Sequence, residues 1–271
     1  MMATAWSFQI GALRFTNFAY GASIMLTMYI TWFFVTAKGW SAPLVVIIVV
    51  AFNFLLGYMM RKTMLRRRQS SSRMIICTMG LQMIITNVAI ILFSGYPRDM
   101  GIRERRIFLA ENVSFGLIQA ACFCMSLVLL LSFHFMLKKT WMGRSIRAVV
   151  QNEEVAMLMG IRSERVLDIA FSISYVLIGV SSMMIMTMYQ VEPTFGGSIQ
   201  AVAFIVCVLA GIGNLGGTFI SGIIVGVVSA LISYTIGTMY LNPILYTVFV
   251  LMLIVKPTGL FNKKSDVAST I

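Results

Sequence analysis

Few residues of this 271-residue chain could carry out chemistry, and they are widely separated. His134 is the only histidine, and it stands near the end of an apolar stretch without partners for a metal site. All four cysteines lie inside apolar stretches, and Cys122 and Cys124 do not have the spacing of a Cys-x-x-Cys redox motif. We therefore predict buried thiols and expect neither a bound metal nor another cofactor.

The acidic residues argue against an enzyme and against a carrier driven by an ion gradient. All nine lie at or beyond the ends of the apolar stretches: Asp99, Glu104, Glu111, Glu153, Glu154, Glu164, Asp168, Glu192 and Asp266. A membrane enzyme needs a nucleophile with a base, or paired acids, facing a cavity. A proton- or sodium-coupled carrier usually needs an ionisable group at membrane depth. Such a carrier stays the alternative in case Asp168 or Glu192 lies deeper than expected.

The elements that hold these residues are expected to be membrane helices. Hydrophobic residues make up 59% of the chain and charged residues 11%, whereas soluble domains carry about 25% charged residues. Apolar stretches of roughly 20 residues recur, which is the length that crosses a bilayer core of about 30 Å. We predict one all-α transmembrane domain, residues 1–271, a polytopic bundle of about eight spans. The expected helices are residues 3–15, 22–37, 42–60, 74–94, 112–137, 166–190, 200–215, 217–236 and 241–256.

The net charge of +12 comes from basic residues placed between the apolar stretches. Two connections hold most of them: Arg61, Lys62, Arg66, Arg67, Arg68 and Arg73 in one, and Lys138, Lys139, Arg144, Arg147, Arg162 and Arg165 in the other. Basic loops stay in the cytoplasm, so we place 61–73 and 138–165 inside, 95–111 outside, and the end with Lys256, Lys263 and Lys264 inside. We expect lipid contact and no nucleic-acid partner, because no basic helix is free of the membrane. No cleavable signal peptide is expected, because the first apolar stretch continues through Asn17 and Gly21.

Residues 17–21 interrupt the first apolar stretch with a polar side chain and a glycine. A break at membrane depth must be covered by other helices or line a polar cavity, and broken helices often form substrate sites. A simple loop at the membrane face is the other interpretation. We name Asn17, Tyr20, Gly21 and Asn87 as candidates for a translocation path, although hydrogen bonds between helices explain polar side chains in spans equally well.

Residues 211–218 are rich in glycine and predict a tight connection at Asn214. Small residues then recur every four positions at Thr218, Gly222, Gly226 and Ala230, a spacing that lets a neighbouring helix approach closely. We therefore assign Gly213, Gly217, Gly222 and Gly226 to helix packing.

The connection 138–165 is predicted to be organised structure. Ile146, Val149, Val150, Met157 and Leu158 fall on one helical stripe, and Arg144, Arg147, Gln151 and Glu154 face elsewhere. Asn152 suits a helix N-cap, Glu153 and Glu154 suit the positive end of a helix dipole, and Gly160 suits the position past the helix end. We expect a short helix at 153–159 that packs on its own protein or docks into a soluble partner; lipid attachment is less favoured because acids and bases are both present.

Four ordered blocks resemble the branched-chain amino acid importer permeases of the ATP-binding-cassette class. They are Asn17-Phe-Ala-Tyr-Gly21, similar to that family's Asn-Phe-Ala-His-Gly; Gly143-Arg-Ser-Ile-Arg-Ala148 with Asn152, Ala156 and Gly160-Ile161; Gly211-Ile-Gly-Asn-Leu-Gly-Gly217; and Lys256-Pro-Thr-Gly-Leu-Phe261. Tyr20 stands where the family usually has histidine, so no role of that imidazole carries over. Residues 3–15 are also too short to cross alone, which leaves the first span abbreviated or the start of the chain late.

The resemblance implies a bacterial plasma-membrane permease for branched-chain or other small amino acids, with urea or short amides as the alternative cargo. It implies that 144–161 contains the coupling helix that sits in a cleft of the ATPase subunit. The coupling residues would be Gly143, Arg144, Arg147, Ala148, Asn152, Glu153, Glu154, Ala156, Gly160 and Ile161. The implied partners are ABC ATPase subunits, a homologous second permease and an extracytoplasmic solute-binding protein. The chain itself has no nucleotide-binding motif, so ATP hydrolysis is expected in a separate chain.

Overall fold

The computed structural model describes residues 1–13, 16–63, 71–101, 106–110, 113–256 and 258–261. In this part of the chain the helices are α1 (Met2–Leu13), α2 (Tyr20–Trp32), α3 (Ala42–Thr63), α4 (Ser71–Phe93), α5 (Leu117–Lys139), α6 (Trp141–Gln151), α7 (Glu153–Leu158), α8 (Ser163–Met186), α9 (Phe195–Ala210), α10 (Leu215–Thr235) and α11 (Leu241–Val255). A π-helix (Phe33–Ala37) continues α2, and a 3-10 helix (Thr238–Tyr240) precedes α11. Of the charged residues named above, Arg66, Arg67, Arg68, Glu104, Glu111, Lys263, Lys264 and Asp266 lie outside the described residues.

Seven helices of the described chain are long and apolar enough to cross a membrane. The helix α9 is also apolar, and its 16 residues span about 24 Å at 1.5 Å per residue. The 12 residues of α1 cover only about 18 Å, roughly half of the bilayer core. The prediction of an all-α polytopic bundle with a discontinuous first helix is confirmed.

One expected helix begins later than predicted. The sequence predicted a helix from residue 112, but the strands β1 (Arg106–Ala110) and β2 (Val113–Gly116) form an antiparallel pair there and α5 starts at Leu117. Short apolar runs do not distinguish a strand from a helix by periodicity. The extended backbone of Gly116, with φ −70° and ψ 123°, marks the change from strand to helix.

The core of the bundle is built around α8, which packs against α1, α2 and α3. Much of α8 is buried, and its buried face carries several small hydroxyl residues. These hydroxyls bond to carbonyls one turn back: Ser172 to Asp168 at 2.9 Å, Ser181 to Leu177 at 2.7 Å and Ser182 to Ile178 at 2.7 Å. This local bonding satisfies polar groups where no water reaches them.

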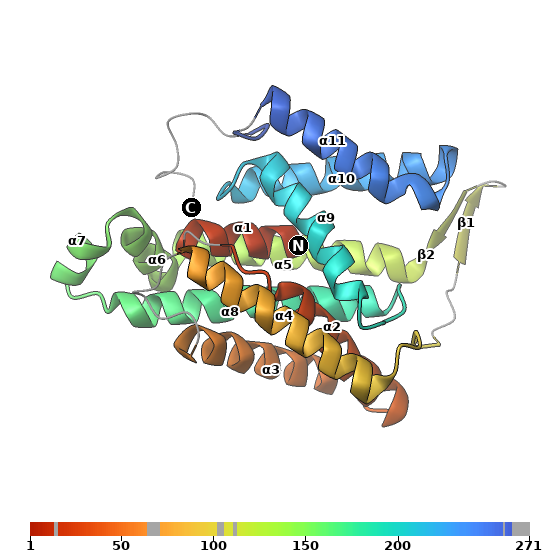
Figure 1. The fold of residues 1–271 in the computed structure, drawn as a ribbon, viewed down its shortest axis with the longest axis horizontal. Helices are drawn as coiled ribbons and strands as arrows, with labels where there is room; N and C mark the ends of the chain where they lie inside the picture. The colour runs from red at the N-terminus through yellow and green to blue at the C-terminus, as the bar shows by residue number, and fades with distance from the viewer. Residues whose placement is uncertain (14–15, 64–70, 102–105, 111–112, 257, 262–271) are drawn as a thin grey trace.

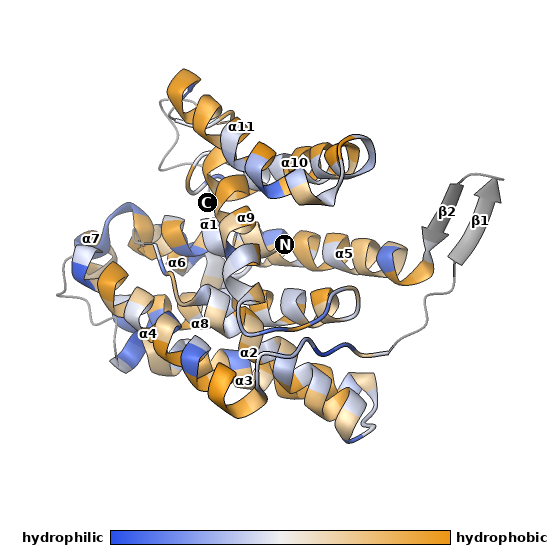
Figure 2. Cartoon of the chain, turned by 45° about the vertical axis from the view of Figure 1, so that its right-hand side comes forward, coloured by the Kyte–Doolittle hydropathy of each residue, from blue (hydrophilic) through white to orange (hydrophobic). Residues whose placement is uncertain are grey.

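The outer helices leave apolar surface uncovered. Long apolar side chains of α3, α4, α5, α10 and α11 are exposed, and Figure 2 shows the hydrophobic colour along these helices. A soluble protein rarely exposes such large apolar areas. The protein is therefore a multi-pass membrane protein, with these faces available to lipid or to other membrane helices.

The two ends of the bundle differ in charge. Figure 1 shows α6 and α7 at one end and the β-hairpin at the other. Basic residues gather at the α7 end: Arg61, Lys62, Arg73, Lys138, Lys139, Arg144, Arg147, Arg162, Arg165 and Lys256. The described residues at the hairpin end include three, Lys38, Arg98 and Arg106. The excess of positive charge places the α7 end in the cytoplasm.

Candidate coupling site and translocation path

The helix α6 is held against the end of α5 by three residues. The Thr140 hydroxyl caps α6 by accepting a hydrogen bond of 3.2 Å from the Gly143 amide. A Cβ atom at Gly143 would collide with the carbonyl of Leu137, so glycine permits this close approach. Arg147 donates from Nη1 to the same Leu137 carbonyl, in the last turn of α5. Gly143 and Arg147 therefore contact their own chain, and Arg144 is exposed.

The short helix α7 has the caps that the sequence predicted. Asn152 Oδ1 accepts a hydrogen bond of 3.1 Å from the Val155 amide at the N-terminus. Gly160 has a φ of +80°, and the Gly160 and Ile161 amides donate to the carbonyls of Met157 and Ala156, both at 3.0 Å. These are the two bonds of a Schellman motif. The predicted helix is confirmed, and it ends one residue earlier than expected.

The apolar residues of α6 and α7 face different ways. Ile146 and Val149 are buried on the bundle, but Leu158 is 87% and Met159 78% exposed. The prediction of one stripe running through Leu158 was wrong, because Asn152 ends α6 in an extended conformation and α7 sets off in a new direction. Ala156 is buried, and the most exposed apolar side chains of this segment are Val155, Leu158 and Met159. We call these three residues the α7 tip.

A buried charge cluster joins α3 to the start of α8. Arg61 in the last turn of α3 is 5% exposed, with its Nε 3.5 Å from Asp168 Oδ1 and its Nη2 3.9 Å from Glu164 Oε2. Further along the same pair of helices, a Cβ atom at Gly57 would lie 3.0 Å from the Cβ of Tyr175. Because α8 follows α7 after four residues, this pair of helices connects the coupling segment to the bundle.

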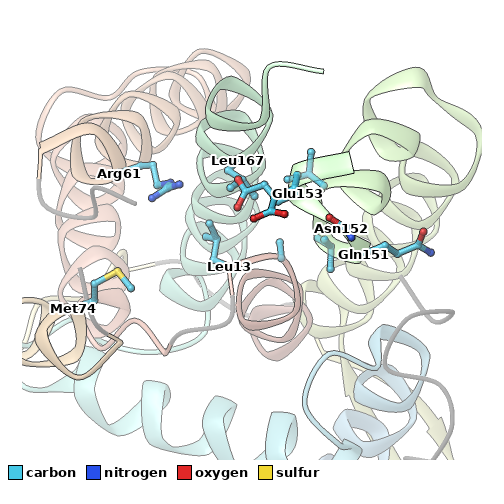
Figure 3. Close-up of a pocket in the computed structure, with 11 residues that line it drawn as sticks. Leu13, Arg61, Met74, Gln151, Asn152, Glu153 and Leu167 are labelled. Carbon is cyan, nitrogen blue, oxygen red and sulfur yellow. The ribbon is translucent and has the colours of Figure 1, made fainter. Parts of the chain in front are cut away.

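A pocket of about 460 Å³ lies beside this cluster. Figure 3 shows Arg61 from α3 on one side and Glu153 with Asn152 on the other, with Leu13 and Leu167 between them. Glu154, Val149, Val150 and Met74 also line it. Of the residues assigned to coupling, Asn152, Glu153 and Glu154 therefore border an open hollow at this end of the bundle, while Ile161 packs on the core.

The break between α1 and α2 lies inside the bundle. Asn17 is fully buried and donates a hydrogen bond of 2.8 Å from Nδ2 to the Tyr175 hydroxyl. The Tyr20 hydroxyl lies 2.9 Å from the Ser174 hydroxyl, and the rings of Tyr20 and Tyr175 are 5.0 Å apart. Tyr175 stands 12 residues into α8, about 18 Å from its start. A simple loop at the membrane face is therefore excluded.

The first turn of α2 also crosses α9 at close range. Gly21 donates its amide to the Gln200 side chain, and a Cβ atom at Gly196 would collide with the Gly21 carbonyl. Sequence reasoning named Gly21 but missed its partners Gly196 and Gln200. The amide of Gln200 inside an apolar helix was the available signal, since a buried amide needs a partner.

Asn87 is not part of this cluster. It is exposed on α4, and its Nδ2 donates 2.8 Å to the Met83 carbonyl of its own helix. An amide on an outer helix face at membrane depth points toward lipid or toward another protein chain.

The glycine-rich segment and the chain end lie on one another. Asn214 caps α10 by accepting 2.8 Å from the Gly217 amide, and its Nδ2 donates 3.1 Å to the Phe261 carbonyl. A Cβ atom at Gly217 would approach the Phe261 Cβ at 2.9 Å. Two sequence blocks that were noted separately therefore form one contact at the cytoplasmic end.

The four packing glycines behave differently from one another. A Cβ atom would lie 3.7 Å from Gly11 Cα at Gly213 and 3.7 Å from Val206 Cγ1 at Gly222, but would meet nothing within 4 Å at Gly226. The buried face of α10 runs through Thr218, Ser221, Val225 and Ile232 instead. Within the described residues nothing packs against Gly226, because α10 is buried where it meets α9 and α1 and Gly226 lies on another face.

In the described ranges, no three His, Cys, Asp or Glu side chains come together as metal ligands would.

Comparison with known proteins gives matches over most of the chain. The sequence model described as "Branched-chain amino acid transport system / permease component" matches residues 1–256. The chain is 26% identical to the high-affinity branched-chain amino acid transport system permease protein LivH of Escherichia coli K12, over 97% of this chain and 91% of that protein. It is 23% identical to the permease protein BraD of Pseudomonas aeruginosa over the same shares, and 32% identical to an autoinducer 2 import system permease, LsrC of Photorhabdus laumondii, over 38% of this chain and 30% of that protein. No solved structure gives a significant match.

Proposed function

This chain belongs to the family of branched-chain amino acid transport system permease components, and we propose that it is the membrane-spanning permease subunit of an ATP-binding-cassette importer for branched-chain or other small amino acids. It is a transport component, and ATP hydrolysis takes place in partner chains. The assembly we propose contains two ATPase subunits, a homologous second permease and an extracytoplasmic solute-binding protein.

The observation that carries this proposal is the α7 tip. Leu158 and Met159 are 87% and 78% exposed on a capped helix that projects from the cytoplasmic end. Large apolar side chains held rigidly at a helix end are suited to insertion into a groove of a partner protein. Acidic residues Glu153 and Glu154 in the first turn make a lipid surface a poor partner. An ATPase cleft is the partner that fits this helix.

The packing supplies a route for movement from α7 into the bundle. Gly160 and Ile161 lead from α7 into α8, and Arg61 clamps the start of α8 to α3. Tyr175 in the middle of α8 then holds the break at Asn17. A displacement of α7 by ATP-driven closure of the ATPase pair would move α8 and α3 together and pull on the broken helix. This is an alternating-access mechanism with the broken helix as its gate.

The translocation path is proposed to run between two permeases. Asn17 bonds to the Tyr175 hydroxyl, and the Tyr20 hydroxyl bonds to Ser174 while its ring packs on that of Tyr175, so these contacts hold the gate in shape. Asn87 instead faces outward from α4. A second permease placed against α4 would bring Asn87 and the wall of the broken helix to a shared path.

Reconstituted transport tests the proposal. The chain would be purified with its ATPase, partner permease and solute-binding protein, and placed in proteoliposomes with leucine and the binding protein on the extracytoplasmic side. We expect ATP-dependent leucine movement and leucine-stimulated ATP hydrolysis. Hydrolysis stimulated by urea or acetamide but not by leucine would reassign the substrate. Leucine uptake driven by a proton or sodium gradient without ATP would overturn the proposal.

A further inference from the structure

The 460 Å³ pocket at the joint of α6 and α7 is lined by three of the residues assigned to coupling, Asn152, Glu153 and Glu154, and by the clamp residue Arg61. The α7 tip does not line it, and neither does the gate cluster around Asn17 and Tyr175. Its volume falls in the range of about 300–1,000 Å³ that is usual for small-molecule sites. It lies at the cytoplasmic end, so a ligand would reach it from the cell interior.

The pocket carries opposite charges on opposite walls. The guanidinium of Arg61 stands on the α3 side, and Glu153 and Glu154 stand on the α7 side (Figure 3). Arg61 also pairs with Asp168 at 3.5 Å and with Glu164 at 3.9 Å. A guanidinium has five N–H donors, so it can serve several carboxylate oxygens at once. A ligand with a carboxylate at one end and an ammonium at the other matches both walls.

The remaining lining is apolar. Leu13, Met74, Leu167 and Val150 come from four different elements and face the same hollow. An aliphatic side chain would be removed from water here, which favours binding by about 25 cal/mol per Å² of apolar surface. A purely polar zwitterion would not gain this contribution.

We propose that this pocket binds a zwitterionic amino acid with an apolar side chain from the cytoplasm, and that the bound amino acid inhibits import. The inference rests on the proposed function, since the ligand class is that of the proposed cargo. Glu153 belongs to α7, Leu167 to α8 and Arg61 to α3, so a ligand that contacts all three holds one arrangement of the coupling joint. Transport requires that joint to rearrange, and a ligand that binds one arrangement better opposes the change. Accumulated product would therefore slow its own uptake.

The test uses leucine and two analogues that each lack one charge, 4-methylpentanoate and 3-methylbutylamine. Proteoliposomes are prepared with the ATPase face outward and with binding protein and leucine in the lumen. Leucine added outside should lower the ATP hydrolysis rate by about fivefold or more, a usual size for allosteric coupling. The single-charge analogues should leave the rate unchanged. Equal inhibition by either analogue, or no inhibition by leucine, would overturn the proposal.

Pocket-filling variants locate the effect. Met74→Trp and Leu13→Trp each place a large ring in the hollow, and Met125→Trp puts the same ring at a side chain of α5 that is 49% exposed, as a control. Inhibition by external leucine should disappear in Met74→Trp, with its uninhibited rate within about twofold of wild type, and should persist in Met125→Trp. If Met74→Trp does not insert into the membrane, Leu13→Trp provides the same test of the pocket. Full inhibition in a pocket-filled variant that inserts normally would overturn the proposal.

A binding measurement separates this inference from the proposed function. The chain alone is placed in lipid nanodiscs, and leucine binding is measured by equilibrium dialysis. Met74→Trp should weaken binding about tenfold or more, and Met125→Trp should not. Leucine binding of this kind without any leucine-stimulated hydrolysis would sink the importer proposal and keep the pocket. Normal leucine transport, without leucine binding that Met74→Trp weakens, would support the importer proposal and overturn the pocket proposal.

Discussion

In the break between α1 and α2, Asn17 donates a hydrogen bond of 2.8 Å to the hydroxyl of Tyr175 in the middle of α8. The other end of the same side chain, Oδ1, accepts 2.9 Å from the Ala19 amide. Asn17 therefore shapes the break and fastens it to the helix that follows the coupling segment. A movement of α8 must either carry the break with it or separate these two residues.

Tyr175→Phe removes this bond and keeps the ring that packs on Tyr20 and Phe171. Hydrogen bonds between membrane helices contribute about 0.6–1.7 kcal/mol, so we expect a loss of stability of about 1 kcal/mol. The number of leucine molecules moved per ATP should fall because the gate is no longer tied to α8. Unfolding in mixed micelles and paired flux and hydrolysis assays measure both effects. Tyr234→Phe, at a side chain that is 92% exposed, is the control and should behave as wild type.

Arg61→Met should destabilise the bundle because it leaves Asp168 and Glu164 without their buried cation. Breaking a buried ion pair costs about 3–5 kcal/mol, and we expect the lower end because Asp168 is 20% and Glu164 54% exposed. The double variant Arg61→Met with Asp168→Leu should recover much of the loss, since both charges are then gone. Thermal unfolding of the purified chain gives the comparison. A double variant less stable than Arg61→Met would contradict the assignment of this pair as a clamp.

Local signals predicted α7 well. Asn152 and Gly160 act within four residues of the helix they cap, so a short stretch of sequence is enough to recognise both ends. The direction of α7 depends on the extended backbone of Asn152 and on what α8 leaves open. Sequence periodicity does not contain that information, which is why Leu158 was placed on the same helical stripe as Ile146 and Val149.

For the same reason, sequence reasoning did not identify hydrogen-bond partners that lie far apart in the chain. Gln200 meets Gly21 across 179 positions, and Asn17 meets Tyr175 across 158. Hydropathy gave the spans, because the cost of unpaired backbone in lipid leaves few alternatives to helices. It does not give the rotation of each helix about its axis. Asn87 and Gly226 were therefore assigned to the interior or to a packing face, and both lie on outer faces of this chain.

Gly143→Ala should displace α6 from the end of α5. Its Cβ would collide with the Leu137 carbonyl, the group to which Arg147 also donates. Overpacking of this kind costs about 1–3 kcal/mol, and here the obstacle is backbone that cannot rotate away. We expect lower stability and weaker recovery of the ATPase. Gly80→Ala on α4 is the matched control, because nothing lies within 4 Å of the added carbon. Equal behaviour of the two variants would show that the close contact at Gly143 is unimportant.

Leu158→Arg tests the docking of the α7 tip directly. The side chain is 87% exposed, so the substitution should leave the fold and membrane insertion intact. If Leu158 is an anchor in an ATPase cleft, its replacement costs about 2 kcal/mol or more of binding, which is about 30-fold in affinity. Met239→Arg places the same residue at a side chain that is 84% exposed in the 3-10 helix at the opposite end of the bundle.

Co-purification and leucine-stimulated ATP hydrolysis compare the two variants. Leu158→Arg should lose the ATPase and the stimulated rate, and Met239→Arg should keep both. An ATPase that remains bound to Leu158→Arg with full stimulation would remove the α7 tip from the coupling interface. Loss of the ATPase in both variants would show that an added arginine harms assembly wherever it is placed, and the docking surface would then have to be sought among other cytoplasmic residues.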